Sequence, residues 1–388
     1  MSHADRRLTW HDPAFLDGVS RSNFLHIGCG SGELCLKALE LGAASATGID
    51  INIAQIRRGE GHLTDANADA HFIKADFEQW EAPPQSFDIT VCANLLHHLY
   101  DPVGAVRKIM QITKRRFYLV LAPGLPRSAR MGSVFALAQS LNWPVVTLSD
   151  RPAALRAADH TFTMTRSALE VIINRHSTAF EPIRWLSRTG GWIAEVRRRQ
   201  IGHLVVVAGA TAVGKSTFID RLGEPALRAR FGLADTHYEV VKPEETLAPG
   251  NHQGVIYHYN LLRPFGRALQ TFERDPAFHL LHSAKRITVI TLANTSDVLR
   301  QRMERRGELP APKWRDRRRN LKIAALANPA FLAEWYDAWL KALGDQVAVT
   351  DSHLILADEH YTDLRNSQRL IKLVGTGLKP ELELQDSH

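Results

Sequence analysis

This chain of 388 residues has little cysteine and no long apolar segment. Its three cysteines, Cys29, Cys35 and Cys92, include no CxxC pair, so we expect buried thiols rather than a metal site. No apolar run approaches the ~20 residues that a membrane-spanning helix needs. Residues 1–13 show no apolar stretch behind their charges, which a secretory signal would have. These absences predict a soluble, cytoplasmic protein without a membrane span.

The length exceeds the usual size of one hydrophobic core, so we expect two domains of roughly 190 residues each. The content of 45% hydrophobic and 23% charged residues is that of a globular protein. The formal charge of +7 suits nucleotide and phosphate ligands as well as nucleic acid. Much of it lies in two basic runs, residues 195–200 and 300–320. We expect the first run to form a solvated basic face.

The first half opens with a glycine-rich pattern. Residues 23–52 predict a short strand, a glycine turn, a helix and a second strand that ends at Asp50. Gly28, Gly30 and Gly32 let the backbone turn sharply and approach a ligand closely. Asp50 follows Gly30 by twenty positions, where a carboxylate accepts hydrogen bonds from ribose hydroxyls. By itself this pattern suits NAD equally well.

Three further strands are expected within residues 72–80, 86–102 and 115–124, and they distinguish between the possible families. With the motifs HIGCGSG, GIDIN and KADF in this order, residues 20–125 resemble the class I S-adenosylmethionine (SAM)-dependent methyltransferases. A helical pattern and two strand-like runs around Gly190 and Gly191 complete a predicted seven-stranded, Rossmann-like α/β sheet. The acceptor is expected under residues 125–175, where no motif names it.

The resemblance implies that the three glycines line the methionine and ribose, that Asp50 holds the ribose, and that Asp76 and Phe77 border the adenine. Asp76 has an alternative role as a helix N-cap. The predicted SAM-binding residues are Gly28, Gly30, Gly32, Asp50, Ile51, Asp76, Phe77 and Asn94. Methyl transfer needs a base only if the acceptor loses a proton, and His97 and its neighbour His98 are the candidates. The turn at residues 93–100 lacks the Asn/Asp-Pro-Pro-aromatic motif of enzymes that methylate DNA base amino groups, which disfavours that class.

The second half carries a phosphate-binding pattern. Residues 203–222 read as a buried strand, the motif Gly209-x-x-x-x-Gly214-Lys215-Ser216, and an amphipathic helix. Backbone N–H groups of such a P-loop surround phosphates, Lys215 reaches the terminal phosphates, and Ser216 is a Mg²⁺ ligand. The predicted ATP-binding residues are Gly209, Gly214, Lys215, Ser216 and Thr217, with Ser216 holding the metal.

An arginine-rich segment follows a later strand, at residues 286–308. Together with the P-loop it resembles the small P-loop kinases of the nucleoside-monophosphate, gluconate and shikimate type, over roughly residues 203–360. In that family arginines form a lid over the phosphates, which makes Arg302 and Arg306 catalytic candidates beside Lys215. A solvated helix face is the alternative. Asn-Lys-x-Asp and a clear acidic Walker B strand are missing, which weakens GTPase and motor ATPase interpretations.

One departure from the kinase pattern matters. The acidic residue expected at the tip of the third strand is replaced by His258 and Asn260. The carboxylate is then expected from Asp235 or Glu239, and Asp235 is the preferred general base. Arg263 has two open roles, in acceptor binding and in a structural ion pair.

We therefore expect a bifunctional enzyme, with a methyltransferase domain at residues 1–197 and a P-loop kinase domain at residues 203–388, both α/β. The fusion indicates successive modification of one small-molecule or glycan acceptor. Two alternatives stay open: a nucleotide-sensing module that regulates methylation, and an RNA-end modifying enzyme. The positive charge favours the second alternative, and the lack of an RNA-binding module with stacking aromatic residues disfavours it. The sequence indicates no oligomeric state.

Overall fold

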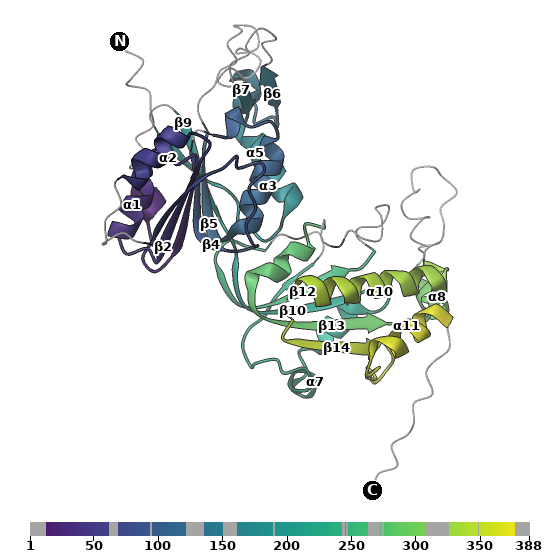
Figure 1. Ribbon diagram of the computed structural model, residues 1–388. Coiled ribbons are helices and arrows are strands. Elements are labelled where there is room, and N and C mark those ends of the chain that lie inside the picture. Colours follow the sequence, from purple (N-terminus) through teal and green to yellow (C-terminus); the bar gives the residue numbers. More distant parts are fainter. Residues whose placement is uncertain are drawn as a thin grey trace. The chain divides into compact units, whose positions relative to one another are not determined.

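The computed structural model describes residues 13–61, 69–93, 95–121, 136–149, 161–188, 191–242, 245, 247–262, 272, 275–306, 326–347 and 349–376 (Figure 1). The chain forms two compact units. The first comprises residues 1–176 and 180–198, and the second comprises residues 177–179 and 199–388. Within the described part of the chain, no helix is long and apolar enough to cross a membrane.

The first unit is built on a seven-stranded sheet with the order β3-β2-β1-β4-β5-β9-β8. Its strands are β1 (Asn23–Ile27), β2 (Ser45–Asp50), β3 (Ala70–Lys74), β4 (Phe87–Ala93), β5 (Thr113–Leu121), β8 (Arg184–Arg188) and β9 (Gly191–Arg197). Strands β1 to β5 pair in parallel, whereas β9 runs antiparallel to both β5 and β8. The predicted Rossmann-like sheet is confirmed.

Helices cover both faces of this sheet, with α1 and α2 on one side and α3 and α5 on the other (Figure 1). The described helices are η2 (Pro13–Leu16), α1 (Glu33–Glu40), α2 (Ile53–Glu60), η4 (Leu96–His98), α3 (Pro102–Ile112) and α5 (Arg166–His176). Strand β4 is buried along most of its length, as expected for a parallel strand covered on both faces. A separate hairpin joins β6 (Val146–Ser149) and β7 (Thr161–Met164).

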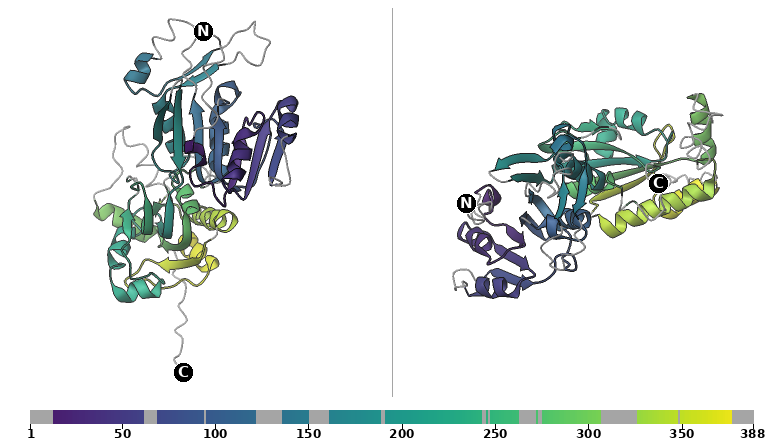
Figure 2. Two further views of the ribbon diagram at one scale, coloured as in Figure 1. Left: turned by 90° about the vertical axis from the view of Figure 1, so that its left-hand side faces the viewer. Right: turned by 90° about the horizontal axis from the view of Figure 1, so that it is seen from above.

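The second unit has a five-stranded, wholly parallel sheet with the order β11-β12-β10-β13-β14. Its strands are β10 (Gln200–Gly209), β11 (Glu239–Val241), β12 (Asn251–Asn260), β13 (Ala284–Ala293) and β14 (Asp351–Leu356). Its helices are α6 (Lys215–Arg221), α7 (Pro225–Arg230), η6 (Phe278–Ser283), α8 (Ser296–Arg305), α10 (Pro329–Gln346) and α11 (Ser367–Thr376). Figure 2 shows α10 and α11 gathered on one side of this sheet. There Trp339 is fully buried and stacks on Tyr259, with ring centroids 5.0 Å apart.

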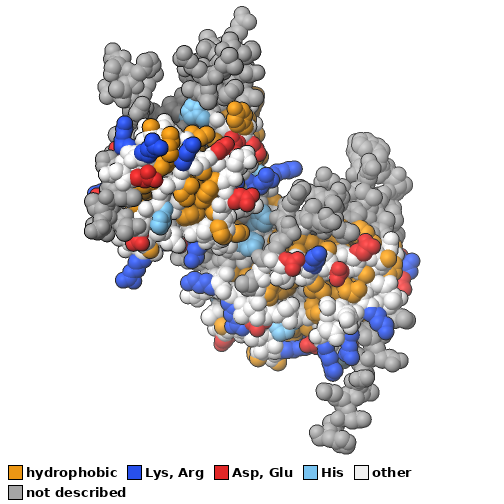
Figure 3. All heavy atoms as spheres, viewed as in Figure 1, with side chains coloured by type: hydrophobic (Ala, Val, Ile, Leu, Met, Phe, Trp, Pro, Cys, Tyr) orange, Lys and Arg blue, Asp and Glu red, His pale blue; other side chains and the backbone are white. Residues whose placement is uncertain are grey.

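The three cysteines are buried, as predicted. Burial raises the pKa of both Cys29 and Cys92 to about 12, so neither thiol is a nucleophile near neutral pH. On the face seen in Figure 3, basic side chains are interspersed with acidic ones.

The basic run at residues 195–200 is not a solvated face, and that prediction is wrong. Arg198 and Arg199 are buried because backbone carbonyl groups accept their guanidinium hydrogens. Arg198 donates to the Met110 and Thr113 carbonyls at 2.8 and 2.9 Å, and so satisfies the end of α3. Burial lowers its pKa to about 10.

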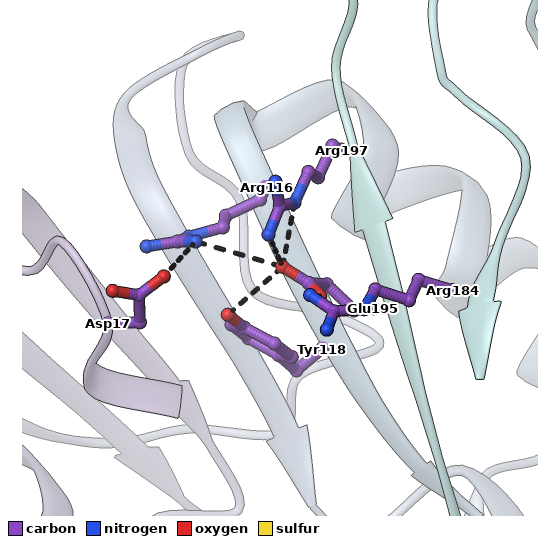
Figure 4. Close-up of polar contacts among 6 residues, drawn as sticks. All are labelled: Asp17, Arg116, Tyr118, Arg184, Glu195 and Arg197. Atoms are coloured by element: carbon purple, nitrogen blue, oxygen red, sulfur yellow. Dashed lines mark hydrogen bonds and ion pairs between the residues drawn. The ribbon is translucent and has the colours of Figure 1, made fainter. Parts of the chain in front are cut away.

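The same run contributes a buried carboxylate to an ionic network (Figure 4). Glu195 is 3% exposed and accepts hydrogen bonds from Arg197 at 2.8 Å and Arg184 at 3.3 Å. Tyr118 donates to the same carboxylate at 3.4 Å, and Arg116 lies 3.7 Å from it. These contacts join β5, β8 and β9 through charged side chains, a pairing that compensates the cost of burying Glu195.

Candidate cofactor and phosphate sites

The glycine loop of the first unit lies between β1 and α1. Gly28, Gly30 and Gly32 have φ angles of 73°, 56° and 76°, a conformation that residues with a Cβ rarely adopt. A Cβ on Gly32 would lie 2.1 Å from the Phe72 ring, whereas one on Gly30 would meet nothing within 4 Å. The loop is therefore tightly packed at Gly32 and open at Gly30.

Asp50 stands beside this opening, at the carboxyl end of β2. Its carboxylate accepts from the backbone N–H groups of Gly30 and Asn52, both at 2.8 Å. Each carboxylate oxygen has a second lone pair, so Asp50 can hold the loop and still accept from ligand hydroxyls. Ile51, the next residue, is 68% exposed. The structure thus brings the predicted glycines, Asp50 and Ile51 to one edge of the sheet.

Asp76 begins the turn after β3. Its carboxylate accepts from the backbone N–H of Glu78 at 2.9 Å and so stabilises the turn. Residues 75–86 contain no helix, so Asp76 is not the helix N-cap that the sequence left as an alternative. The Phe77 side chain is 3% exposed, and its ring lies 6.4 Å from that of Trp80. Phe77 is therefore a packed core side chain in this structure.

Two residues that sequence reasoning missed fix this turn. Lys108 of α3 donates to the carbonyl oxygens of Phe77, Glu78 and Trp80, at 3.0, 2.9 and 2.6 Å. Glu78 accepts from the backbone N–H groups of Tyr100 and Asp101 at 3.1 and 2.7 Å. The carboxylate therefore ties the Asp76 turn to the segment that follows His97 and His98. The partners are 22 to 31 positions apart, and no motif signals such a pairing.

His97 lies on η4, at the carboxyl end of β4, and its ring centroid is 3.9 Å from that of His98. Burial, with the neighbouring His98, lowers the pKa of His97 to about 4, so its imidazole is neutral at pH 7. Strand β7 lies against η4. Asn94 lies outside the described residues.

The loop of the second unit joins β10 to α6. Ala212 and Gly214 have φ angles of 63° and 109°. Lys215 is 5% exposed, and its ammonium donates to the carbonyl oxygens of Gly209 and Ala210 at 2.8 and 2.7 Å. Ser216 and Thr217 are exposed on the first turn of α6. The predicted phosphate-binding residues thus lie on one loop, with the lysine folded back onto it.

Tyr336 of α10 was not anticipated from the sequence and fastens the same loop. Its hydroxyl accepts from the Ala210 N–H at 3.1 Å and donates to the Leu292 carbonyl at the end of β13 at 2.7 Å. The hydroxyl therefore connects the loop to the neighbouring strand. The tyrosine is 126 residues from its loop partner, too far along the chain for any local pattern to indicate the contact.

Of the two candidate arginines, Arg302 reaches the loop. Its guanidinium donates to the Val213 carbonyl at 2.6 Å and to the Ala357 carbonyl at 3.0 Å. Burial, and then the charge of Arg306, lowers its pKa. Arg306 itself is exposed at the end of α8. The rest of the predicted lid, residues 307–320, and Arg263 lie outside the described residues.

Asp235 is the predicted general base of the second unit. It is exposed in the turn before β11, where the chain enters the sheet at the edge opposite the loop. Helices α6 and α7 return the chain to that edge, where Gly232 lies near the Arg286 guanidinium at the start of β13. Glu239 likewise lies at the beginning of β11, 3.0 Å from His252. The role of Asp235 as the general base stays a prediction.

Asn260 occupies the end of β12, paired in register with Gly209. Its amide donates to the Thr211 hydroxyl at 3.3 Å and its carbonyl oxygen accepts from the Leu262 N–H at 3.1 Å. An amide thus fills the place where the sequence pattern led us to expect a carboxylate.

Comparison with known proteins bears on the N-terminal half of the chain. Residues 24–116 match the family model for a methyltransferase domain. A ubiquinone biosynthesis O-methyltransferase from Saccharophagus degradans is 32% identical over 97 residues, which cover 25% of this chain and 41% of that protein. A ribosomal protein L11 methyltransferase from Neisseria gonorrhoeae is 34% identical over 138 residues, covering 35% of this chain and 43% of the relative. The chain thus spans less than half the length of these relatives.

Among solved structures, an S-adenosylmethionine-dependent methyltransferase from Mesorhizobium loti is 17% identical, with a TM-score of 0.36, and covers 48% of this chain and 96% of that chain. The family match includes strands β1 to β4 of this sheet and the beginning of β5. The N-terminal half therefore contains a methyltransferase domain with a Rossmann-like α/β fold and a mixed sheet.

Proposed function

We propose that the first unit binds SAM and transfers its methyl group to a small-molecule or glycan acceptor. The observation that carries this proposal is the carboxylate of Asp50 beside the open Gly30, at the carboxyl edge of the sheet. A carboxylate there can accept the two ribose hydroxyl hydrogens of a nucleoside, and the open glycine admits its close approach. The relative named for ubiquinone biosynthesis fits a small-molecule acceptor.

Methyl transfer from a sulfonium is an in-line displacement, so the enzyme contributes mainly orientation and the exclusion of water. His97 is the candidate base for an acceptor that must lose a proton, because its imidazole is neutral and lies near the end of β4. The tie between Glu78 and the Tyr100 backbone would hold the adenine-side turn and the His97 segment in a fixed relation.

We further propose that the second unit is a P-loop kinase that uses ATP and Mg²⁺. Support comes from the strand, loop and helix around Lys215, and from Arg302, which is anchored to the loop. Ser216 fits the metal because its hydroxyl is exposed at the start of α6, and Mg²⁺ prefers oxygen ligands. The ion would offset phosphate charge during transfer. Residues 1–197 and 203–388 are the proposed limits of the two catalytic domains, and the protein is proposed to be cytoplasmic.

A second candidate function for this unit is nucleotide sensing, in which ATP is bound but not consumed. The neutral Asn260 at the end of β12 favours it, because a carboxylate there would be expected to help hold the metal.

One experiment tests the enzyme and the sensor together. A metabolite and glycan extract is incubated with the full-length protein, a methyl-labelled donor and γ-labelled ATP, and the products are separated. One product that carries both labels supports two successive modifications. Methylation that requires ATP without any transfer of the phosphate label supports the sensor.

A further inference from the structure

His258 lies in β12, two residues before Asn260, and its side chain is on the same face of the strand. The neighbouring tyrosines point to the other face, where Tyr259 stacks on Trp339. Asn260 contacts the loop directly through Thr211. His258 is therefore on the loop side of β12, about 7 Å along the strand from that contact.

The two ring nitrogens of His258 differ in their surroundings. Nδ1 is shielded from solvent and has no hydrogen-bond partner among the described residues. Nε2 does not combine these two properties. The side chain as a whole is partly exposed. A proton is therefore better placed on Nε2, where water or a ligand oxygen can accept it.

The charges of two lysines on neighbouring elements act on this imidazole. Lys215 lies at the start of α6 and Lys242 follows the end of β11. Burial, together with the charges of Lys215 and Lys242, lowers the pKa of His258 to about 4. The ring is consequently neutral at physiological pH, and the Lys215 ammonium favours a bare lone pair over a second N–H.

We infer that His258 is a ligand-contacting residue of the second unit, where it donates an Nε2–H hydrogen bond to an anionic oxygen of the terminal phosphate. This inference rests on the proposed nucleotide function of that unit. The site then uses a neutral donor two residues before the strand end at which a metal-holding carboxylate was expected. A neutral imidazole adds no cation to a place that already has Lys215, so it can bind the phosphate oxygen without repelling the lysine.

The test uses the full-length chain with ATP and Mg²⁺. His258→Phe keeps a planar ring and removes the donor, whereas His258→Gln keeps an N–H near the Nε2 position. ATP affinity, measured by calorimetry, is expected to fall about ten- to hundredfold in the Phe variant and to stay within about threefold of wild type in the Gln variant. His252→Phe is the matched control, since it removes a histidine from the same face of β12 at the opposite end. It should leave ATP affinity unchanged.

A pH series separates a neutral donor from a proton acceptor. Wild type and His258→Gln should show the same pH dependence of ATP affinity between about pH 5.5 and 9, because a donor with the assigned properties does not ionise there. A step near neutral pH that disappears in the Gln variant overturns the inference. So does a Phe variant that melts like wild type and binds ATP as tightly. If wild type itself binds no ATP and Lys215→Ala changes nothing, the nucleotide proposal fails and the role of His258 fails with it.

Discussion

The two units each place a glycine-containing loop between the first strand of a parallel core and a helix, but the loops are braced by opposite charges. In the first unit the brace is an anion, the Asp50 carboxylate, which accepts from the Gly30 N–H. In the second it is a cation, the Lys215 ammonium, which donates to two carbonyl oxygens of its own loop. The sign of the brace matches the ligand proposed for each loop: a sulfonium-bearing nucleoside for the first, and a polyanionic triphosphate for the second.

The braces also differ in what happens when a ligand arrives. Asp50 has spare lone pairs, so it can keep its loop contacts while it binds ribose. Lys215 uses its ammonium on the loop and must share or exchange those bonds to reach a phosphate. Tyr336 and Arg302 hold the second loop independently, through Ala210 and Val213. The second loop is therefore expected to keep its shape when its lysine turns to a ligand.

The largest effect is expected from Lys215→Ala. In a kinase this ammonium offsets charge that builds up on the bridging oxygen as the phosphoryl group leaves, so its contribution is greater in the transition state. Phosphoryl transfer should fall about a thousandfold or more, equivalent to ~4 kcal/mol, while ATP binding weakens much less. Labelled-phosphate transfer and calorimetry measure the two quantities. Methyl transfer by the same variant is the control and should be unchanged. Methylation that loses its dependence on ATP in this variant would instead support the sensor.

Asp50→Ala is expected to affect the loop of the first unit and to leave the loop of the second unit unchanged. The loss of a charged acceptor for buried ligand hydroxyls should weaken SAM binding by ~2–4 kcal/mol, or roughly thirty- to a thousandfold. ATP affinity should not change. Asp88→Ala is a matched control, because it removes a carboxylate that also accepts from a backbone N–H, that of Asn23, but at the start of β1, at the other end of the strand from the glycine loop. Equal SAM affinity in the Asp50 variant and wild type would remove Asp50 from the site.

Asp50 and Lys215, the residues that brace the two loops, could be predicted from sequence motifs. The residues that hold neighbouring segments in place could not. The positions of Asp50 and Lys215 follow from local patterns, since each lies within a strand, turn and helix that the sequence predicts. Lys108, Glu78 and Tyr336 act on backbone groups far away in the chain, and their residue types suit an exposed helix or loop equally well. The surroundings of Asp235 could not be predicted, because the sequence does not show to which edge of the sheet α6 and α7 return the chain. The burial of Arg198 and Arg199 was not predicted, because a sequence does not show which backbone carbonyl groups will accept hydrogen bonds from a side chain.

Substitutions at two glycines of the first loop distinguish the cost of a steric overlap from the cost of a left-handed backbone conformation. Gly32→Ala places a Cβ 2.1 Å from the Phe72 ring at a φ of 76°, so we expect the free energy of unfolding to fall by ~3 kcal/mol. Gly30→Ala meets nothing within 4 Å, and only its φ of 56° opposes the side chain, which should cost ~1 kcal/mol. Urea unfolding measures both. If the Gly30 variant loses SAM affinity while it stays folded, the open position is a ligand contact. Equal destabilisation by the two substitutions would contradict the packing assigned to Gly32.

A modest effect is expected from Tyr336→Phe, which removes one hydroxyl and nothing else. That hydroxyl joins Ala210 of the loop to Leu292 of β13, and both backbone partners are buried. Leaving a buried N–H and a buried carbonyl without this partner should lower the free energy of unfolding by ~1–3 kcal/mol. If the tyrosine also holds the loop in shape for phosphate, ATP affinity should fall severalfold while SAM affinity stays the same. Tyr259→Phe is the control, because its hydroxyl is bonded to Asp275 on the same side of the sheet. It should lower stability by a similar amount and leave ATP affinity unchanged. A Tyr336 variant that loses stability but binds ATP as wild type does would show that Lys215 and Arg302 alone keep the second loop in place.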